Sequence, residues 1–242
     1  LTPIYASSTF TFDTATEGSE RFAGKDKTKI YSRWGNPSFT VAEEIIAALE
    51  TFGLKNESGN PLEVKALLHS SGQAALSTLF LGTLSKGDAV LTHHALYGGT
   101  HELLHKVLAD TGVETVMINL NDEAIEAAIA EYTTIKLIHI ETPSNPTLRC
   151  IDIERVCAIA KNKGILVSVD NTAATPYLQQ PFKWGADFVM HSTTKFLNGH
   201  GTAVGGILLG KDLTLMNGPI WKWHVLLGGN SNAFDSFLLT NG

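Results

Sequence analysis

Five short polar segments of the chain could carry chemistry, and each follows an apolar stretch of strand length. They are Ser70–Gln73, Tyr97–Thr100, Glu141–Pro146, Asp170–Thr172 and His191–Lys195. Each segment alone is weak support for a site, because turns between strands and helices are often polar. If the strands run parallel, their carboxyl ends meet at one edge of a sheet, where ligands of such sheets bind. We therefore expect these segments to form one site.

Two of the segments are suited to a close approach of the backbone to a ligand. Ser71-Gly72-Gln73 lies where a strand should turn into a helix, so unpaired amides and the positive helix end would face an anion such as a phosphate. Tyr97, followed by two glycines, could lay its ring on a flat heteroaromatic ligand. The competing interpretations are an ordinary N-cap serine with a turn glycine, and a common Tyr-Gly-Gly turn.

Asp170 and Lys195 could hold opposite charges at neighbouring strand ends. Asp170 ends an apolar strand, where a carboxylate is costly to bury unless it meets a cation such as a protonated pyridine nitrogen. Lys195 follows the next strand within three residues, and an amine at a half-buried strand end suits Schiff-base chemistry. Ser192 and Thr194 flank it with hydroxyls suited to phosphate oxygens. Taken alone, Asp170 could equally be a helix cap or turn residue, and Lys195 a surface residue.

A competing motif, His101-Glu102-Leu103-Leu104-His105, matches H-E-x-x-H. On a helix this spacing puts two imidazoles on one face as zinc ligands, with the Glu as general base, and would indicate a zinc hydrolase. The motif also needs a third ligand and an open cleft, which no other pattern identifies. Its helix is more simply the one that follows Tyr97 and packs behind the strand ends. For His69, His93 and His94 we likewise prefer core or surface positions.

Alternating strands and helices predict the scaffold that positions these segments. Strands are expected at 64–70, 89–94, 114–120, 135–141, 165–171 and 188–192, and helices around 73–84, 100–111, 121–132 and 152–163. Asn121 and Asp152 are expected as N-caps. Near-continuous apolar strands separated by helices indicate a mostly parallel sheet covered on both faces, an α/β fold.

The first part of the chain predicts an arm and a helix. Residues 1–37 combine glycines, prolines and scattered aromatic residues without periodic patterning, which indicates an extended arm. A helix should begin near Thr40, because Thr40 and Glu43 form a capping-box pair. Gly53 would end this helix. Its apolar residues at helical spacing are Val41, Ile45, Leu49 and Phe52.

Composition favours small-molecule chemistry. The chain has 242 residues, 43% of them hydrophobic, which is enough for a substantial core. With 18 basic and 24 acidic residues and no basic cluster, we expect neither nucleic acid nor a membrane surface as partner. No apolar stretch predicts a membrane span, and two cysteines are too few for a disulfide framework, so we expect a cytoplasmic protein. The ends at Leu1 and Gly242 favour a piece of a longer chain.

With these segments in place, the chain resembles the Cys/Met-metabolism (trans-sulfuration) enzymes that depend on pyridoxal 5′-phosphate (PLP). The family includes methionine γ-lyase, cystathionine γ-lyase, cystathionine γ-synthase and O-acylhomoserine sulfhydrylase. The likeness runs from Pro3-Ile4-Tyr5 through Tyr31–Pro37 to Gly199-His200-Gly201, besides the strand-end segments. It implies PLP as cofactor and an α/β, fold-type-I, aspartate-aminotransferase-like domain preceded by an extended arm.

The resemblance implies a role for each site residue. Lys195 would carry the cofactor, Asp170 would face its pyridine nitrogen, and Tyr97 would stack on its ring and act as an acid or base. Arg33, together with Tyr31, would reach the phosphate of a neighbouring subunit's cofactor. The expected cofactor-binding residues are Ser71, Gly72, Gln73, Tyr97, Asn145, Asp170, Thr172, Ser192, Thr194, Lys195, Tyr31 and Arg33. Within this set, the Gly72 and Gln73 amides, Ser192 and Thr194 would hold the phosphate, and Asn145 would lie near the 3′-oxygen and the substrate carboxylate.

Two positions depart from the lyases of that family. Methionine γ-lyases typically have a cysteine two residues after the stacked tyrosine, where this chain has Gly99. After Gly199-His200-Gly201, several lyases and cystathionine synthases have Asp, whereas the segment from Thr202 looks more like O-acylhomoserine sulfhydrylases. The family chain also continues beyond Gly242 into a smaller domain, which supplies an arginine for the substrate carboxylate.

We therefore predict elimination or replacement at Cγ of a sulfur amino acid or an O-acylhomoserine. The alternatives are a β-lyase acting on cystathionine or cysteine, a catalytically silent homologue, and the zinc hydrolase of a different class. We expect residues 1–39 to be an arm that reaches a neighbouring subunit, 40–215 the PLP-binding domain, and 216–242 the start of a linker or C-terminal domain. The expected partners are a small amino-acid substrate and further copies of the chain, in a homodimer or homotetramer with shared active sites.

Overall fold

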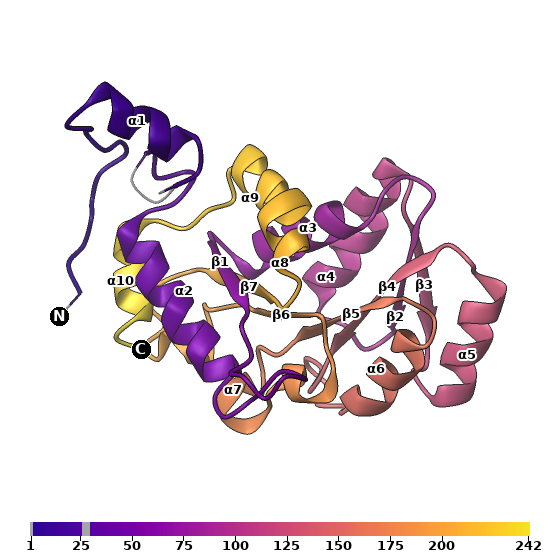
Figure 1. Ribbon diagram of the computed structural model, residues 1–242. Helices are drawn as coiled ribbons and strands as arrows, with labels where there is room; N and C mark the ends of the chain where they lie inside the picture. The colour runs from indigo at the N-terminus through magenta and orange to yellow at the C-terminus, as the bar shows by residue number, and fades with distance from the viewer. Residues whose placement is uncertain (1, 26–29) are drawn as a thin grey trace.

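The computed structural model describes residues 2–25 and 30–242, arranged as an α/β domain with an N-terminal arm (Figure 1). The strands are β1 (Lys65–His69), β2 (Ala89–His93), β3 (Glu114–Ile118), β4 (Ile135–Glu141), β5 (Leu166–Asp170), β6 (Phe188–His191) and β7 (Gly206–Gly210). The α-helices are α1 (Ala15–Phe22), α2 (Pro37–Glu50), α3 (Gly72–Thr83), α4 (Gly98–Glu102), α5 (Asp122–Glu131), α6 (Ile153–Lys161), α7 (Thr175–Leu178), α8 (Leu213–Leu215), α9 (Trp221–Leu227) and α10 (Ala233–Leu239).

The strands form one sheet in the order β1-β7-β6-β5-β4-β2-β3. Neighbouring strands pair in parallel from β6 to β3, while β7 runs antiparallel to both β1 and β6. Two antiparallel pairings in succession leave β1 pointing the same way as β6. The carboxyl ends of β1, β2, β4, β5 and β6 therefore lie at one edge, and the predicted mostly parallel α/β sheet is confirmed.

Helices cover both faces of the sheet (Figure 1). On one face, α3 and the helical segment after Tyr97 pack on Leu67, Val90 and Leu137. On the other face, α5 and α6 pack on β2, β4 and β5, and α2 with α10 covers β1, β6 and β7. Because the strands other than the edge strand β3 are largely buried on both faces, they read as nearly continuous apolar runs in the sequence. None of the helices in the described part of the chain has the length and apolar character needed to cross a membrane.

The helix expected near Thr40 begins earlier, so that prediction was wrong in detail. Asn36 is the N-cap of α2, its side chain accepts a hydrogen bond from the Ser38 amide at 2.9 Å, and Pro37 occupies the first turn. Proline is preferred there because its missing N–H would have no partner in the helix. The Glu43 carboxylate instead accepts the Leu68 amide at 2.8 Å. The helix ends at Glu50, three residues before Gly53, and Thr51 is its C-cap.

The apolar residues that suggested this helix are largely exposed. Ile45 is 40% exposed, Leu49 is 47% exposed and Phe52 is 80% exposed, whereas Phe39 and Ile46 pack against the sheet. The described chain therefore carries an uncovered apolar surface along α2.

Several elements were not predicted, namely α1, β7 and the helices α7, α8, α9 and α10. The arm contains α1, whose N-cap Thr14 accepts a hydrogen bond from the Glu17 amide at 3.1 Å. Strand β7 lies in the centre of one half of the sheet, between β1 and β6. The region expected as one helix at 100–111 is α4 followed by a π-helix at Leu103–Leu108 and a 3₁₀ turn. The expected N-caps Asn121 and Asp152 are both observed.

Candidate active site

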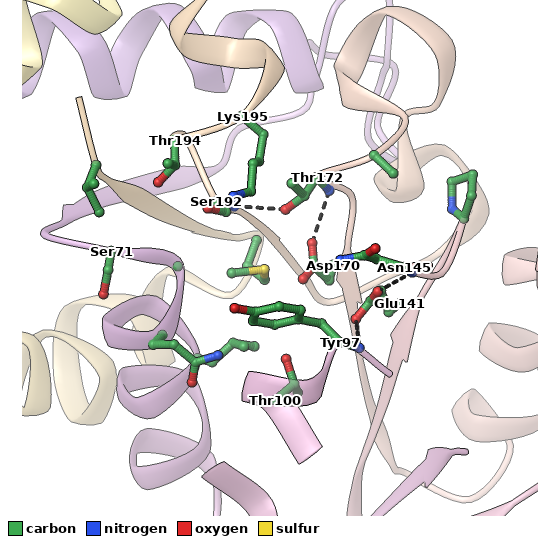
Figure 2. A pocket seen from close by; sticks show the side chains of 17 residues that line it. Ser71, Tyr97, Thr100, Glu141, Asn145, Asp170, Thr172, Ser192, Thr194 and Lys195 are labelled. Atoms are coloured by element: carbon green, nitrogen blue, oxygen red, sulfur yellow. Dashed lines mark hydrogen bonds between the residues drawn. The ribbon is translucent and has the colours of Figure 1, made fainter. Parts of the chain in front are cut away.

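One cavity of about 300 Å³ lies at the carboxyl edge of the sheet (Figure 2). It is lined by the N-terminal turn of α3, by Tyr97, and by residues that follow β4, β5 and β6. Every predicted site residue lines it except Tyr31 and Arg33. The structure thus brings together side chains from five separate segments, as expected for the carboxyl ends of parallel strands.

The first turn of α3 forms one wall of the cavity. Ser71 is the N-cap, and its Oγ accepts a hydrogen bond from the Ala74 amide at 3.1 Å, so the ordinary capping role is present. The amides of Gly72 and Gln73 have no acceptor inside the helix and lie at its positive end. A Cβ at position 72 would lie 3.0 Å from the Ser192 Cβ, so only glycine lets the two segments approach this closely. This wall is suited to an anion.

A chain of hydrogen bonds joins the ends of β5 and β6. The Thr172 amide donates to Asp170 Oδ1 at 3.0 Å, and Thr172 Oγ1 accepts the Ser192 amide at 2.8 Å. Burial raises the pKa of the Asp170 carboxyl, although the Thr172 hydrogen bonds oppose this shift. A buried carboxylate without a cation is in an unfavourable state. The site is therefore suited to a cationic group beside Asp170.

Lys195 differs from the sequence-based expectation. The residue lines the cavity but is exposed rather than half-buried. Within the described residues, no group accepts a hydrogen bond from its ammonium. The neighbouring Thr194 hydroxyl donates to the Gly205 carbonyl at 3.1 Å and accepts the Gly205 amide at 3.0 Å. Thr194 thus holds the turn that presents Lys195, and its hydroxyl proton is already engaged.

The Tyr97 ring lies so close to position 99 that only glycine fits there. A Cβ at position 99 would lie 2.5 Å from Tyr97 Cε1 and 2.8 Å from Gln73 Nε2. Gly99 therefore allows this ring position. From the sequence, the glycines after Tyr97 were expected only to let the backbone approach a ligand closely. The ring is half-exposed and points into the cavity (Figure 2).

Glu141 lies in one of the five predicted segments, but no role was predicted for it. It ends β4, lines the cavity and is 4% exposed. Burial raises its pKa to about 7, with a further contribution from Asp170, while the amides of Tyr97 and Asn145 act in the opposite direction. The available signal was a carboxylate at the end of an otherwise apolar strand, the same signal that identified Asp170.

A buried polar cluster supports the cavity from the side of α2. Glu50 Oε1 lies 2.6 Å from His191 Nε2 and accepts a hydrogen bond from Asn171 Nδ2 at 2.9 Å. Gln179 Nε2 donates to Asn171 Oδ1 at 2.8 Å. Glu50, His191 and Asn171 are fully buried, and the latter two precede Ser192 and Thr172 directly. The cluster therefore ties α2 to two strand ends of the site.

Replacing Glu50 by Ala is expected to lower the free energy of unfolding of the full-length protein by about 3–5 kcal/mol. The change leaves His191 Nε2 and one Asn171 N–H buried without an acceptor, which is the costly outcome for a buried polar pair. Glu50→Gln keeps the shape and one acceptor and should cost less. Urea unfolding of the cofactor-free protein measures both, with the exposed Glu44→Ala on the same helix as control. Equal midpoints for Glu50→Ala and Glu44→Ala would contradict the role of the cluster.

The H-E-x-x-H segment lies on the surface. The rings of His101 and His105 are 4.3 Å apart between centroids, but Glu102 pairs with Lys106 at 2.6 Å and His105 lies against Met117. Within residues 2–25 and 30–242, no three His, Cys, Asp or Glu side chains gather in a way that could hold a metal. The third ligand that a zinc hydrolase needs is therefore not found in the described chain.

Tyr31 and Arg33 lie on the arm, outside the cavity. The Arg33 guanidinium donates to the Val225 carbonyl at 2.8 Å and lies over the Tyr31 ring at 5.2 Å from its centroid. Neither residue contributes to the cavity of its own chain.

Comparison with known proteins identifies the family. A model described as Cys/Met metabolism PLP-dependent enzyme matches residues 1–242. The chain belongs to this family. The earlier resemblance, the fold type and PLP as cofactor are thereby confirmed. An L-methionine gamma-lyase of Porphyromonas gingivalis is 41% identical over 243 residues, covering 100% of this chain and 58% of that protein.

Other family members with different reactions are nearly as similar. A cystathionine beta-lyase of Lactococcus lactis is 41% identical, covering 99% of this chain and 57% of its own. The crystal structure of cystathionine gamma synthase from Xanthomonas oryzae, in complex with aminoacrylate and cysteine, superposes with a TM-score of 0.85 at 33% identity, covering 99% of this chain and 56% of that one. The chain thus spans a little over half the length of the relatives it matches, and identity does not separate the reactions.

The residues at the cavity fit PLP. The buried Asp170 carboxyl, whose raised pKa reflects burial, is suited to the protonated pyridine nitrogen. The amides at the start of α3, in close contact with Ser192, suit a phosphate. Lys195 has no competing partner among the described residues. Each of these features is suited to a different part of the same cofactor.

Proposed function

We propose that the protein catalyses PLP-dependent elimination or replacement at Cγ of a sulfur amino acid or an O-acylhomoserine. The observation that carries this proposal is the gathering of Tyr97, Asp170 and Lys195 around one cavity in a chain of this family. The substrate class is inferred from the named activities of the relatives, which act as lyases or synthases.

The roles proposed for the residues follow from their chemistry. When bound, PLP accepts the electron pair left at Cα after a proton is removed. Asp170 keeps a proton on the pyridine nitrogen, which favours that electron withdrawal. Lys195 would carry the cofactor, and its free amine would remove the Cα proton. Tyr97 lies in the same cavity and is the proposed acid or base for the leaving group at Cγ.

The visible spectrum of the purified full-length protein tests this proposal. We expect a yellow protein whose visible absorption is lost on borohydride reduction, with the cofactor fixed on Lys195 in peptide mapping. Lys195→Ala should abolish the reducible linkage. A colourless protein that binds zinc would refute the proposal and favour the zinc alternative.

A second candidate is β-elimination from cystathionine or cysteine at the same cofactor site. The Lactococcus lactis relative named cystathionine beta-lyase supports it, since it is as similar as the methionine gamma-lyase. Product analysis with methionine, cystathionine and O-acetylhomoserine separates the two: pyruvate from cystathionine indicates β-elimination, whereas 2-oxobutanoate or a replacement product indicates chemistry at Cγ.

We further propose a cytoplasmic homodimer or homotetramer with shared active sites. Tyr31 and Arg33 lie outside the cavity of their own chain, which is consistent with a role at a neighbouring site. The exposed apolar side chains along α2 also suit contact with another copy. In this arrangement residues 1–39 form the arm, 40–215 the PLP-binding domain, and 216–242 lead toward a C-terminal domain.

A further inference from the structure

Glu141 holds two parts of the site at once. Its Oε2 accepts a hydrogen bond from the Tyr97 amide at 2.8 Å, and its Oε1 accepts one from the Asn145 amide at 2.6 Å (Figure 2). Tyr97 follows β2, and Asn145 lies in the turn after β4. The two residues are far apart in the chain, so its connectivity does not fix their relative positions. A single side chain therefore links two separately anchored segments across the cavity edge.

The Glu141 main chain is itself fixed. Its amide donates to His93 Nε2 at 3.0 Å, and β4 pairs with β5 so that Glu141 lies beside Asp170. The strand thus provides a rigid base, and the carboxylate extends from that base to the two loops. This is the arrangement expected of a residue that supports the groups that contact the ligand.

Only a carboxylate can satisfy this geometry. Both partners are N–H donors, so both oxygens of residue 141 must accept. A glutamine would turn its NH₂ group toward one of the two amides, whichever way it faced, and one contact would become a clash of donors. Both hydrogen bonds join the Glu141 carboxylate to main-chain amides, so Glu141 acts through Tyr97 and Asn145.

We propose that Glu141 is a positioning residue that fixes the backbones of Tyr97 and Asn145 relative to each other, and thereby sets how both meet the PLP ring. This rests on the proposed function, in which Tyr97 stacks on the ring and Asn145 lies near its 3′-oxygen. The proposal extends that function, because it assigns the alignment of the two groups to one carboxylate behind them.

Amide hydrogen exchange in the cofactor-free, full-length protein tests the tether directly. In Glu141→Gln we expect faster exchange at Tyr97 or Asn145, or at both, by about 10-fold or more, because a hydrogen bond to a charged acceptor is lost. Exchange of the Ser192 amide, which donates to Thr172, should not change. Glu57→Gln, on an exposed loop, is the matched control. Unchanged exchange at both amides would overturn the proposal.

The holoenzyme tests the consequence for the cofactor. In Glu141→Gln we expect an altered visible circular dichroism of the bound PLP, which reports the asymmetry around its ring, and turnover lowered about 10- to 100-fold. Glu141→Asp keeps the charge but is one methylene too short to reach both amides, so it should loosen at least one amide, and it provides the test if the Gln variant does not fold. Lost turnover with a wild-type dichroism band and protected amides would overturn the positioning role.

The two measurements separate this inference from the proposed function. If the wild-type protein bound no PLP, the proposed function would fail, while amide exchange in the same protein would still decide whether Glu141 tethers the two segments. If PLP bound normally and the amides of the Gln variant stayed protected, only the role of Glu141 would fail.

Discussion

Mixing two inactive variants, Lys195→Ala and Arg33→Ala, is expected to restore about a quarter of wild-type activity. If Arg33 serves the site of the neighbouring subunit, a hybrid dimer has one site with both defects and one site with neither. Random exchange makes about half of the dimers hybrid, and half of the sites in these dimers are intact. Arginine suits this role because its planar fork can hold a phosphate through two parallel charge-assisted hydrogen bonds.

The measurement is activity after subunit exchange in full-length protein, with exchange verified by mass labels. Arg33 also donates to the Val225 carbonyl within its own chain, so the Arg33→Ala variant needs a thermal melt to show that it is folded. If activity stays absent although exchange is complete, Arg33 serves its own chain or no cofactor at all, and the shared site is refuted.

Replacing Asp170 by Asn is expected to leave PLP bound and to lower turnover by about 100-fold or more. Asn has nearly the same shape and can keep the Thr172 amide contact, but it lacks the charge that favours a protonated ring nitrogen. Kcat and the cofactor dissociation constant are measured separately, with the exposed Asp110→Asn as control. Near-normal turnover in Asp170→Asn would contradict the assignment of Asp170 to the pyridine nitrogen.

The strand ends could be predicted from the sequence because their signal is local. Each buried strand is a short apolar run, and a parallel sheet brings the residues after such runs to one edge, whatever the details of the helices. Asn121 and Asp152 were predicted as caps for the same reason, since a capping side chain reaches an amide only two or three residues away.

What depends on distant partners could not be predicted in this way. Strand β7 is a short apolar run that begins and ends with glycine, a residue depleted in strands, and its place in the sheet is set by pairing with β1 and β6. Helix α1 did have a local signal, Thr14 followed by Glu17, of the same kind that was misread at Thr40 and Glu43. In α2 that pair was misleading because the Glu43 side chain accepts a hydrogen bond from the Leu68 amide in β1, 25 positions away.

The site residues also differ in whether their positions depend on local sequence signals or on contacts with distant segments. Spacing indicated that Lys195 follows a strand, but its exposure depends on how the turn to Gly205 folds. The link that Glu141 makes to Tyr97 was overlooked because the Tyr97 amide belongs to another segment, and no sequence pattern reveals that contact. The other residues that line the cavity could be predicted because they follow predicted strands.

The place of β7 in the sheet has a consequence for synthesis on the ribosome. Strand β1 pairs with β7, and Lys65 faces Gly210, so the two halves of this pairing leave the ribosome about 140 residues apart. At synthesis rates of about 5–20 residues per second, β1 is made roughly 7 to 30 seconds before β7. During that time its apolar residues, buried in the finished sheet, have no strand beside them. The first strand to be made therefore gains its only neighbour in the described sheet when the last strand is made.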